Sequence, residues 1–245
     1  MTKSIIVIPA RYQSSRFPGK PLAMIAGKTL LQRVYEIACA ACKNMPDVEI
    51  YVATDEERIE QHALMLGAKV VMTPAECKTG SDRALATCLQ LKTAPEIVVN
   101  LQGDAPLTPP HFVTAILTTL IKNSQCDVAT PVAQLSWDGL DDLRHSKSQR
   151  PFSGTTAIID DNDNALWFSK NIIPAMRDEK KLREQSALSP IHRHIGLYGY
   201  RFAALQKFVT LPEGKYEALE GLEQLRFLEH GMTIKAVKVD YGQLP

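Results

Sequence analysis

Long apolar runs are missing from this sequence of 245 residues. The apolar stretch near its start, S-I-I-V-I-P-A at residues 4–10, is much shorter than the roughly 18 residues of a membrane span. It is also too short for the core of a secretory signal peptide. We therefore predict a cytoplasmic protein with no membrane partner.

A large net charge and a disulfide framework are missing as well. The formal net charge is +1, which provides no bulk attraction for nucleic acid. The five cysteines are scattered and odd in number, which predicts reduced thiols. Cys39 and Cys42 have the C-x-x-C spacing, but they lie in a helical pattern, so we interpret them as small helix residues.

Two common nucleotide-binding motifs are absent. Gly19 and Lys20 are followed by Pro21 rather than Ser or Thr, so there is no Walker A sequence. No G-x-G-x-x-G follows a predicted strand, which argues against a dinucleotide cofactor.

The first half of the sequence alternates between strand and helix patterns. Continuous apolar runs predict buried strands, and apolar residues at helical spacing predict the helices between them. The predicted strands are 4–10, 49–54, 68–73, 96–102 and 127–135, and the predicted helices include 30–41, 81–91 and 109–122. This alternation predicts a largely parallel sheet.

From about residue 136 the pattern changes to short strands without helices between them. These are predicted at 155–160, 165–170 and 194–200, with a turn at N-D-N, residues 162–164. Residues 178–190 are polar and predict a mobile loop, residues 217–230 an amphipathic helix, and residues 233–239 a last strand. We therefore expect a small antiparallel annex beside the parallel sheet.

Three loops follow predicted parallel strands and should meet at one edge of the sheet, where ligands bind. The first, after residue 9, holds Arg11, Arg16, Lys20 and Gly19; the second is T-P-A-E-C-K-T-G-S-D-R at 73–83; the third contains Asp104. Converging cations and backbone N–H groups suit phosphates. A single carboxylate beside phosphates suits Mg²⁺.

Each residue taken alone also fits a structural role. A cationic loop can be solvated and idle, and Asp104 after Gly103 can be a turn residue. His192 and His194 can share a strand face, where a hydrogen-bonded pocket histidine is a better reading than a metal pair. The joint occurrence of the three loops favours a functional site.

Several motifs together resemble the 3-deoxy-manno-octulosonate cytidylyltransferases, the CMP-Kdo synthetases of lipopolysaccharide synthesis. The motifs are P-A-R-Y-Q-S-S-R-F-P-G-K-P-L, T-G-S-D-R, V-V-N-L-Q-G-D, A-L-W-F-S-K, H-I-G-L-Y-G-Y and L-E-G-L-E-Q-L-R-F-L-E-H-G, spread over residues 4 to 239. The resemblance implies an α/β fold of three layers, nucleotidyltransferase-like, with a mostly parallel central sheet. It also implies a homodimer that uses Mg²⁺, CTP and a sugar acid.

The resemblance assigns roles to individual residues. It implies one domain over residues 1–245, with a nucleotide-binding half at 1–135 and a sugar-binding and dimerisation half at 136–245. Arg11, Lys20, Gln102 and Asp104 would be catalytic, with Asp104 as the Mg²⁺ ligand. The nucleotide would contact Ala10, Arg11, Ser14, Arg16, Lys20, Thr73, Gly80, Ser81 and Arg83, and the sugar would contact Lys170, His194, Tyr198, Glu223 and Gln224.

The sequence departs from this family pattern at four places. Ala105 stands where the family has Glu, Lys170 where it has Arg, and G-T-T-A-I-I where it has a V-K-V strand. The family's G-V-D-T-P-E-D motif, which holds a second metal ligand, has no match in the given sequence, which reads V-D-Y-G-Q-L-P at this place. Three interpretations follow: the motif lies beyond the given residues, Asp240 substitutes for the ligand, or the metal site is reduced. Two alternatives follow: a cytidylyltransferase for 8-amino-Kdo or a nonulosonate, or a nucleotide-binding protein with reduced catalysis.

Overall fold

The chain forms two compact units, each built from two separate stretches of sequence. The computed structural model describes residues 3–13 and 17–240. The first unit is Met1–Gln125 with Leu197–Thr210, and the second is Cys126–Gly196 with Leu211–Pro245. The strand at residues 198–201 belongs to the first unit because it pairs with residues 97–100. The predicted nucleotide-binding half at 1–135 and sugar-binding half at 136–245 stay a prediction.

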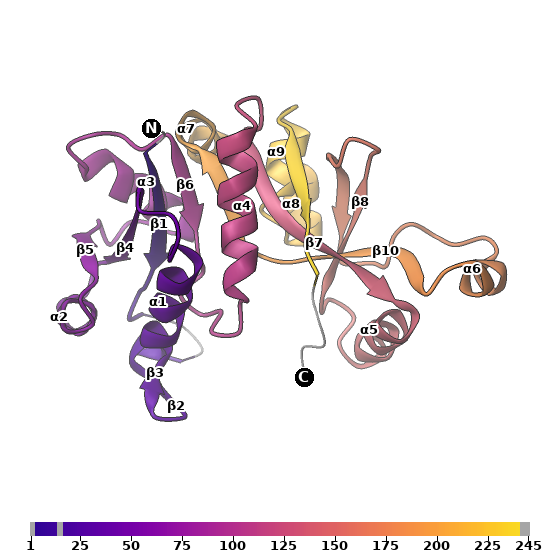
Figure 1. Cartoon of the computed structure of the whole chain (residues 1–245), viewed down its shortest axis with the longest axis horizontal. Coiled ribbons are helices and arrows are strands. Elements are labelled where there is room, and N and C mark those ends of the chain that lie inside the picture. The colour runs from indigo at the N-terminus through magenta and orange to yellow at the C-terminus, as the bar shows by residue number, and fades with distance from the viewer. Residues whose placement is uncertain (1–2, 14–16, 241–245) are drawn as a thin grey trace. The chain divides into compact units, whose positions relative to one another are not determined.

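The sheet of the first unit is mostly parallel. Its strand order is β5-β4-β1-β6-β11, in which β11 alone runs antiparallel to its neighbour (Figure 1). The strands are β1 (Ser4–Pro9), β4 (Val48–Thr54), β5 (Lys69–Met72), β6 (Ile97–Asn100) and β11 (Tyr198–Arg201), with a small hairpin of β2 (Met24–Ile25) and β3 (Lys28–Thr29).

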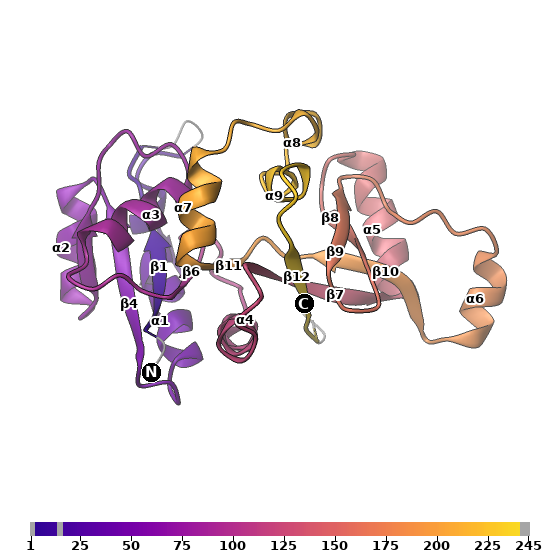
Figure 2. The ribbon, with the colours of Figure 1, turned by 90° about the horizontal axis from the view of Figure 1, so that it is seen from above.

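Helices cover both faces of this sheet, so the first unit has three layers. Figure 2 shows α3 and α7 on one face and α1 and α4 on the other. The helical elements are η1 (Lys20–Leu22), α1 (Leu30–Ala41), α2 (Glu57–Met65), α3 (Gly80–Gln90), α4 (Pro110–Lys122) and α7 (Phe202–Thr210). The helices predicted at 30–41, 81–91 and 109–122 are confirmed within one residue at each end.

The central strands β1 and β6 carry continuous apolar runs because both faces of the sheet are covered. Ile5, Ile6, Val7 and Ile8 of β1 have no exposed surface, and each such side chain stabilises the fold by roughly 1.5–3 kcal/mol. The parallel arrangement brings the carboxyl ends of β1, β4, β5 and β6 to one edge, where the three loops singled out in the sequence emerge.

The second unit contains the predicted antiparallel strands. Strand β10 pairs antiparallel with β7 and β8, and β8 with β9, while β12 pairs parallel with β7. The strands are β7 (Val128–Ser136), β8 (Thr155–Ile159), β9 (Ala165–Ser169), β10 (Leu188–His194) and β12 (Ile234–Lys238). The prediction of an α/β fold with a mostly parallel sheet and a smaller antiparallel part is confirmed.

The helices of the second unit correct three predictions. They are α5 (Trp137–Gln149), α6 (Glu179–Gln185), α8 (Lys215–Glu220) and α9 (Leu225–Glu229). No helix was expected at 137–149, a mobile loop was expected at 178–190, and one helix was expected at 217–230. The predicted strand at 194–200 is also wrong, since β10 ends at His194 and β11 begins at Tyr198.

Each correction has a local cause. Helix α5 is polar and buries only Trp137, Leu140 and Leu143, so its apolar stripe is too narrow to stand out in the sequence. Helix α6 is held by ion pairs from Glu179 to Arg144 and Arg183, at 2.7 Å each. Gly221 ends α8 in the left-handed conformation with φ 61°, which glycine adopts without steric cost.

No helix in the described ranges 3–13 and 17–240 combines the length and the apolar character that crossing a membrane requires.

Candidate functional site

A cleft lies at the carboxyl edge of the parallel sheet in the first unit. It has a cavity of about 180 Å³ and is formed by the segments that follow β1, β5 and β6. Its lining residues are Pro9, Ala10, Arg11, Lys20, Pro21, Leu30, Cys77, Lys78, Thr79, Gly80, Arg83, Gln102, Gly103 and Asp104. A wider cavity of about 1050 Å³ shares Arg11, Lys20, Cys77, Arg83 and Asp104 with it.

Two glycines allow these segments to approach each other closely. A Cβ on Gly103 would lie 2.3 Å from the carbonyl oxygen of Pro9, which no side chain can occupy. A Cβ on Gly80 would lie 3.1 Å from Asn100 Nδ2 and 3.4 Å from Pro9 Cγ. The cleft therefore has walls made of backbone, whose N–H groups can face a ligand.

The first turn of α3 forms one wall of the cleft. Thr79 caps the helix by accepting a hydrogen bond from Asp82 N at 3.1 Å, and Asp82 Oδ2 accepts from Thr79 N at 2.8 Å. This reciprocal pair is a capping box. It explains the T-G-S-D motif locally, and it leaves the positive end of the helix dipole beside the cleft.

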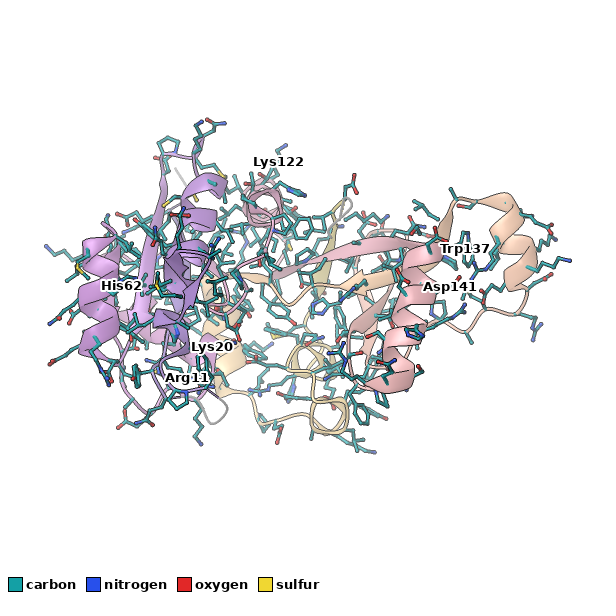
Figure 3. The ribbon with its side chains drawn as sticks, turned by 90° about the horizontal axis from the view of Figure 1, so that it is seen from below. Arg11, Lys20, His62, Lys122, Trp137 and Asp141 are labelled. Carbon is teal, nitrogen blue, oxygen red and sulfur yellow. The ribbon has the colours of Figure 1, made fainter. Side chains whose placement is uncertain are left out.

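The cationic loop provides the opposite wall. Gly19 adopts φ 73° and its N–H donates to Tyr12 O at 2.8 Å, which closes the loop before η1. Arg11 Nη1 donates to Lys78 O at 3.2 Å, so it joins this loop to the segment before α3. Figure 3 shows Arg11 and Lys20 at the same end of the unit. Ser14 and Arg16, also predicted here, lie outside the described residues.

Asp104 is the one acidic side chain among the described residues that line the 180 Å³ cavity. Its Oδ2 accepts from Lys20 Nζ at 2.7 Å, and its side chain is 58 % exposed. One accessible carboxylate beside a phosphate site fits Mg²⁺, which is held by one or two carboxylates together with substrate phosphates and water. Groups of three or more His, Cys, Asp or Glu side chains that could hold a metal ion do not occur in the described part of the chain.

Arg83 lies in the inner part of the cleft and is almost fully buried, with 3 % of its surface exposed. Thr73 belongs to the same group, because its hydroxyl accepts from Arg83 Nη1 at 2.6 Å. Ser81 is buried in the first turn of α3 and is not among the residues lining the cavity. Of the described residues predicted to bind the nucleotide, the structure thus brings together Ala10, Arg11, Lys20, Thr73, Gly80 and Arg83, with Gln102 and Asp104 beside them.

Several lining residues were not predicted. Pro9, Pro21, Cys77, Lys78, Thr79 and Gly103 lie inside the loops and motifs that the sequence analysis quotes, but no role was assigned to them individually. Leu30 reaches the cleft through the fold and carried no signal in the sequence.

The residues predicted to bind the sugar fall into different units. Lys170, His194, Glu223 and Gln224 belong to the second unit, whereas Tyr198 lies on β11 in the first. Tyr198 is opposite Asn100 of β6, and its ring stacks on Tyr200 with the centroids 6.2 Å apart.

His194 ends strand β10 in a buried position. Its Nε2 is 2.9 Å from the Thr130 hydroxyl, and its ring packs edge-on against Phe168 with the centroids 4.9 Å apart. Burial lowers the pKa of His194 to about 3, because desolvation disfavours the charged imidazolium. His194 is therefore neutral at physiological pH and acts as a hydrogen-bonding group.

The segment that carries Lys170 is fixed through its backbone. Glu220 accepts from Ser169 Oγ at 2.7 Å and from Lys170 N at 2.8 Å. Lys147 Nζ donates to Lys170 O. Burial, followed by the charges of Lys170 and Arg193, lowers the pKa of Lys147. Lys147 is therefore surrounded by two positive charges, of Lys170 and Arg193, and one negative charge, of Glu220.

The turn between α8 and α9 holds Glu223 and Gln224. Arg226 binds the buried carboxylate of Glu217 from Nε at 2.7 Å and from Nη2 at 2.5 Å, which ties the two helices together. Gln224 is 3 % exposed, and its Nε2 has no acceptor among the residues that the structure describes. A buried donor without a partner costs about 1–3 kcal/mol, so this amide is available to a ligand.

A cationic loop, the N-terminus of a helix and a single carboxylate surround the cleft of the first unit. At the carboxyl ends of parallel strands, this combination is characteristic of a nucleotide-binding α/β protein.

Comparison with known proteins makes the class specific. The family model for cytidylyltransferases matches residues 5–234, and the chain belongs to this family of nucleotidyltransferases. A 3-deoxy-manno-octulosonate cytidylyltransferase from Maricaulis maris is 42% identical over 238 residues, covering 97% of this chain and 88% of the relative. An 8-amino-3,8-dideoxy-manno-octulosonate cytidylyltransferase from Shewanella piezotolerans is 43% identical over 233 residues, covering 94% of this chain and 87% of the relative.

Solved structures agree with this assignment. The structure of a CMP:2-keto-3-deoxy-manno-octonic acid synthetase complexed with CTP matches with a TM-score of 0.83 and 35% identity, covering 98% of this chain and 90% of that one. A cytidylyltransferase from Leptospira borgpetersenii matches with a TM-score of 0.57 and 16% identity, which supports the fold alone. The predicted nucleotidyltransferase-like fold is confirmed.

Proposed function

We propose that this protein transfers the cytidylyl group of CTP to 3-deoxy-manno-octulosonate, Kdo, releasing CMP-Kdo and pyrophosphate. The cleft of the first unit carries the proposal: exposed cations, the start of α3 and one carboxylate meet there in a chain of the cytidylyltransferase family. The product serves lipopolysaccharide synthesis, the enzyme is a cytoplasmic homodimer, and residues 136–245 contribute to sugar binding and dimerisation.

The proposed chemistry is an in-line attack on the α-phosphate by the anomeric hydroxyl at C2 of the sugar. Arg11 and Lys20 bind the phosphates and offset the charge that grows on the phosphoryl oxygens and on the leaving pyrophosphate. Asp104 holds the Mg²⁺ ion, which neutralises phosphate charge when bound. Gln102 lines the cleft next to Gly103 and offers an amide to orient the reacting groups.

In this proposal Lys170, His194, Glu223 and Gln224 of the second unit bind the sugar acid. Lys170 supplies a positive charge for the carboxylate, and the buried amide of Gln224 supplies a donor for a hydroxyl. A site that provides many hydrogen bonds rejects analogues that leave its buried groups unpaired. We therefore expect a clear preference for one sugar acid over its close relatives.

A second candidate substrate is 8-amino-Kdo. The observation that favours it is the Shewanella piezotolerans relative, which is as similar to this chain as the relatives named for Kdo.

Pyrophosphate release separates these possibilities. The assay supplies CTP, Mg²⁺ and, in parallel reactions, Kdo, 8-amino-Kdo, sialic acid and pseudaminic acid. Fastest turnover with Kdo supports the main proposal, and fastest turnover with 8-amino-Kdo supports the second candidate. A nine-carbon acid as the best substrate overturns both while leaving the family unchanged. CTP binding without turnover of any acid identifies a nucleotide-binding protein with reduced catalysis.

A further inference from the structure

Arg83 stands apart from the other cations of the cleft because it is buried and already paired. Its exposed fraction is 3 %, whereas the side chain of Lys20 is 41 % exposed. A buried guanidinium without a partner is strongly unfavourable, so the residues that compensate it determine what it can bind.

Two side chains compensate Arg83, and both come from the ends of neighbouring parallel strands. Asp55 follows β4 and places Oδ2 at 3.3 Å from Arg83 Nη2. Thr73 follows β5 and accepts from Arg83 Nη1 at 2.6 Å, while its own hydroxyl donates to Thr54 O at 3.2 Å. The register that pairs Thr54 with Met72 holds these two acceptors at the same level of the sheet.

This arrangement leaves part of the guanidinium unused. An arginine side chain has five N–H donors, and the acceptors that the described residues offer to Arg83 are Thr73 Oγ1 and Asp55 Oδ2. Since Arg83 also lines the cleft, donors remain for a ligand, at an orientation set by Asp55 and Thr73.

The charge of Asp55 changes the kind of ligand that Arg83 prefers. The carboxylate cancels the guanidinium charge locally, so the pair offers directed donors with little net attraction for an anion. Arg11 and Lys20 retain that attraction. A neutral acceptor, such as a ring carbonyl of the base or a ribose oxygen, therefore suits Arg83 better than a phosphate.

We propose that Asp55 is a positioning residue of the nucleotide site, which orients Arg83 and cancels its charge so that Arg83 binds the nucleoside part of CTP. This inference rests on CTP being the substrate. Asp55 lines the wider cavity beside Arg83, and the proposal assigns it a role that depends on Arg83.

The test compares two ligands that differ only in the nucleoside. Calorimetry measures the Kd of CTP and of inorganic tripolyphosphate, each with Mg²⁺ and without sugar acid, for the wild type and for Asp55→Asn. The matched control is Glu57→Gln, which removes an exposed carboxylate at the start of α2 that lines neither cavity. The wild type reports on the proposed function, since it must bind CTP more tightly than tripolyphosphate, whereas the variants report on Asp55.

Asp55→Asn should weaken CTP binding at least about tenfold, the loss expected for a contact worth about 1.4 kcal/mol. Tripolyphosphate should bind as tightly as to the wild type or more tightly, because the charge of Arg83 is no longer cancelled. Glu57→Gln should change neither Kd. Unchanged CTP binding in Asp55→Asn overturns the proposal. An equal loss for both ligands also overturns it, because that result means a general distortion of the site.

Asp55→Asn leaves the buried charge of Arg83 without its partner, which can impair folding of this variant. A second comparison therefore removes both charges together. Asp55→Asn is combined with Arg83→Gln, which removes both charges. If Asp55 acts through Arg83, adding Asp55→Asn to Arg83→Gln should change the CTP Kd less than about twofold. A further loss as large as that in the wild-type background contradicts the proposal.

Discussion

Lys20 and Asp104 form an ion pair across the mouth of the cleft, with Nζ and Oδ2 2.7 Å apart. The first is the proposed phosphate-binding cation and the second the proposed Mg²⁺ ligand. Their side chains are 41 % and 58 % exposed, so water screens the pair. Its contribution to the free energy of unfolding is about 0–1 kcal/mol. Exchanging it for contacts to a nucleotide and a metal ion therefore costs little.

Lys20→Ala should lower kcat/KM for CTP by about ten- to a hundredfold, because a charged contact to phosphate contributes about 1.5–3 kcal/mol. The matched control is Lys28→Ala, which removes a lysine paired with Glu36 at the same 2.7 Å and with a similar exposure of 45 %. Steady-state kinetics and urea unfolding of both variants make the comparison. Equal kinetics in the two variants would mean that Lys20 does not contact the phosphates.

Asp104→Asn should reduce activity by orders of magnitude, since an amide keeps the shape of the side chain but loses the charge that holds a hard cation. Its unfolding free energy should change by less than about 1 kcal/mol, because the side chain is exposed and its ion pair is screened. The measurement is pyrophosphate release against Mg²⁺ concentration. Glu36→Gln is the control, and an Asn variant with the wild-type Mg²⁺ dependence would exclude Asp104 as the ligand.

Gly103→Ala should distort the cleft, because the new Cβ would lie 2.3 Å from Pro9 O and one backbone segment must move. We expect a loss of stability of about 1–3 kcal/mol, typical of overpacking, together with weaker CTP binding. Gly196→Ala is the control, since a Cβ there has no atom within 4 Å. Wild-type stability and CTP affinity in Gly103→Ala would show that the backbone approach is not required.

Lowering the pH should destabilise the protein through His194. Its native pKa of about 3 lies below the ordinary 6.5, so between these values the unfolded state binds the proton and the native state does not. The contribution of neutral His194 to the free energy of unfolding is complete above about pH 6.5. It decreases by up to ~1.4 kcal/mol per pH unit as the pH falls below that value.

Urea unfolding from about pH 7 to about pH 4.5 measures this slope. His194→Gln should show a smaller decrease than the wild type, and His111→Gln, which removes an exposed histidine, is the control. Parallel curves for the wild type and His194→Gln would show that His194 is not the group that titrates.

Lys170→Arg should tighten Kdo binding if Lys170 faces the sugar carboxylate, because a guanidinium binds a carboxylate with two parallel bonds. The backbone at this position is held by Glu220 and Lys147, so the substitution changes mainly the head group. Lys181→Arg on exposed α6 is the control. A KM for Kdo that is unchanged in both variants places Lys170 outside the sugar site.

Local sequence patterns were sufficient where burial was strong. Strands β1 and β6 are buried almost along their whole length, the helices α1, α3 and α4 each bury an apolar stripe, and all of these were predicted. Strands β4 and β5 are less buried, and their apolar runs still predicted them. Helices α5 and α6 were not, because their order comes from few buried side chains and from contacts far apart in sequence. Trp137 Nε1 donates to Ser186 O at 2.7 Å, and Arg183 lies 4.6 Å from the Trp137 ring, a contact between residues on different helices (Figure 3).

The sequence by itself determined the three loops and their chemistry, because alternating buried strands and helices require a parallel sheet whose strand ends meet. Motif resemblance then extended this to the family. Only the tertiary structure decided which residues share the cleft. The pairing of β4 with β5 brings Asp55 and Thr73 to Arg83, and the backbone approach at Gly103 shapes the wall. Such contacts join residues whose separation in the sequence is unrelated to their distance in space, so no local pattern contains them.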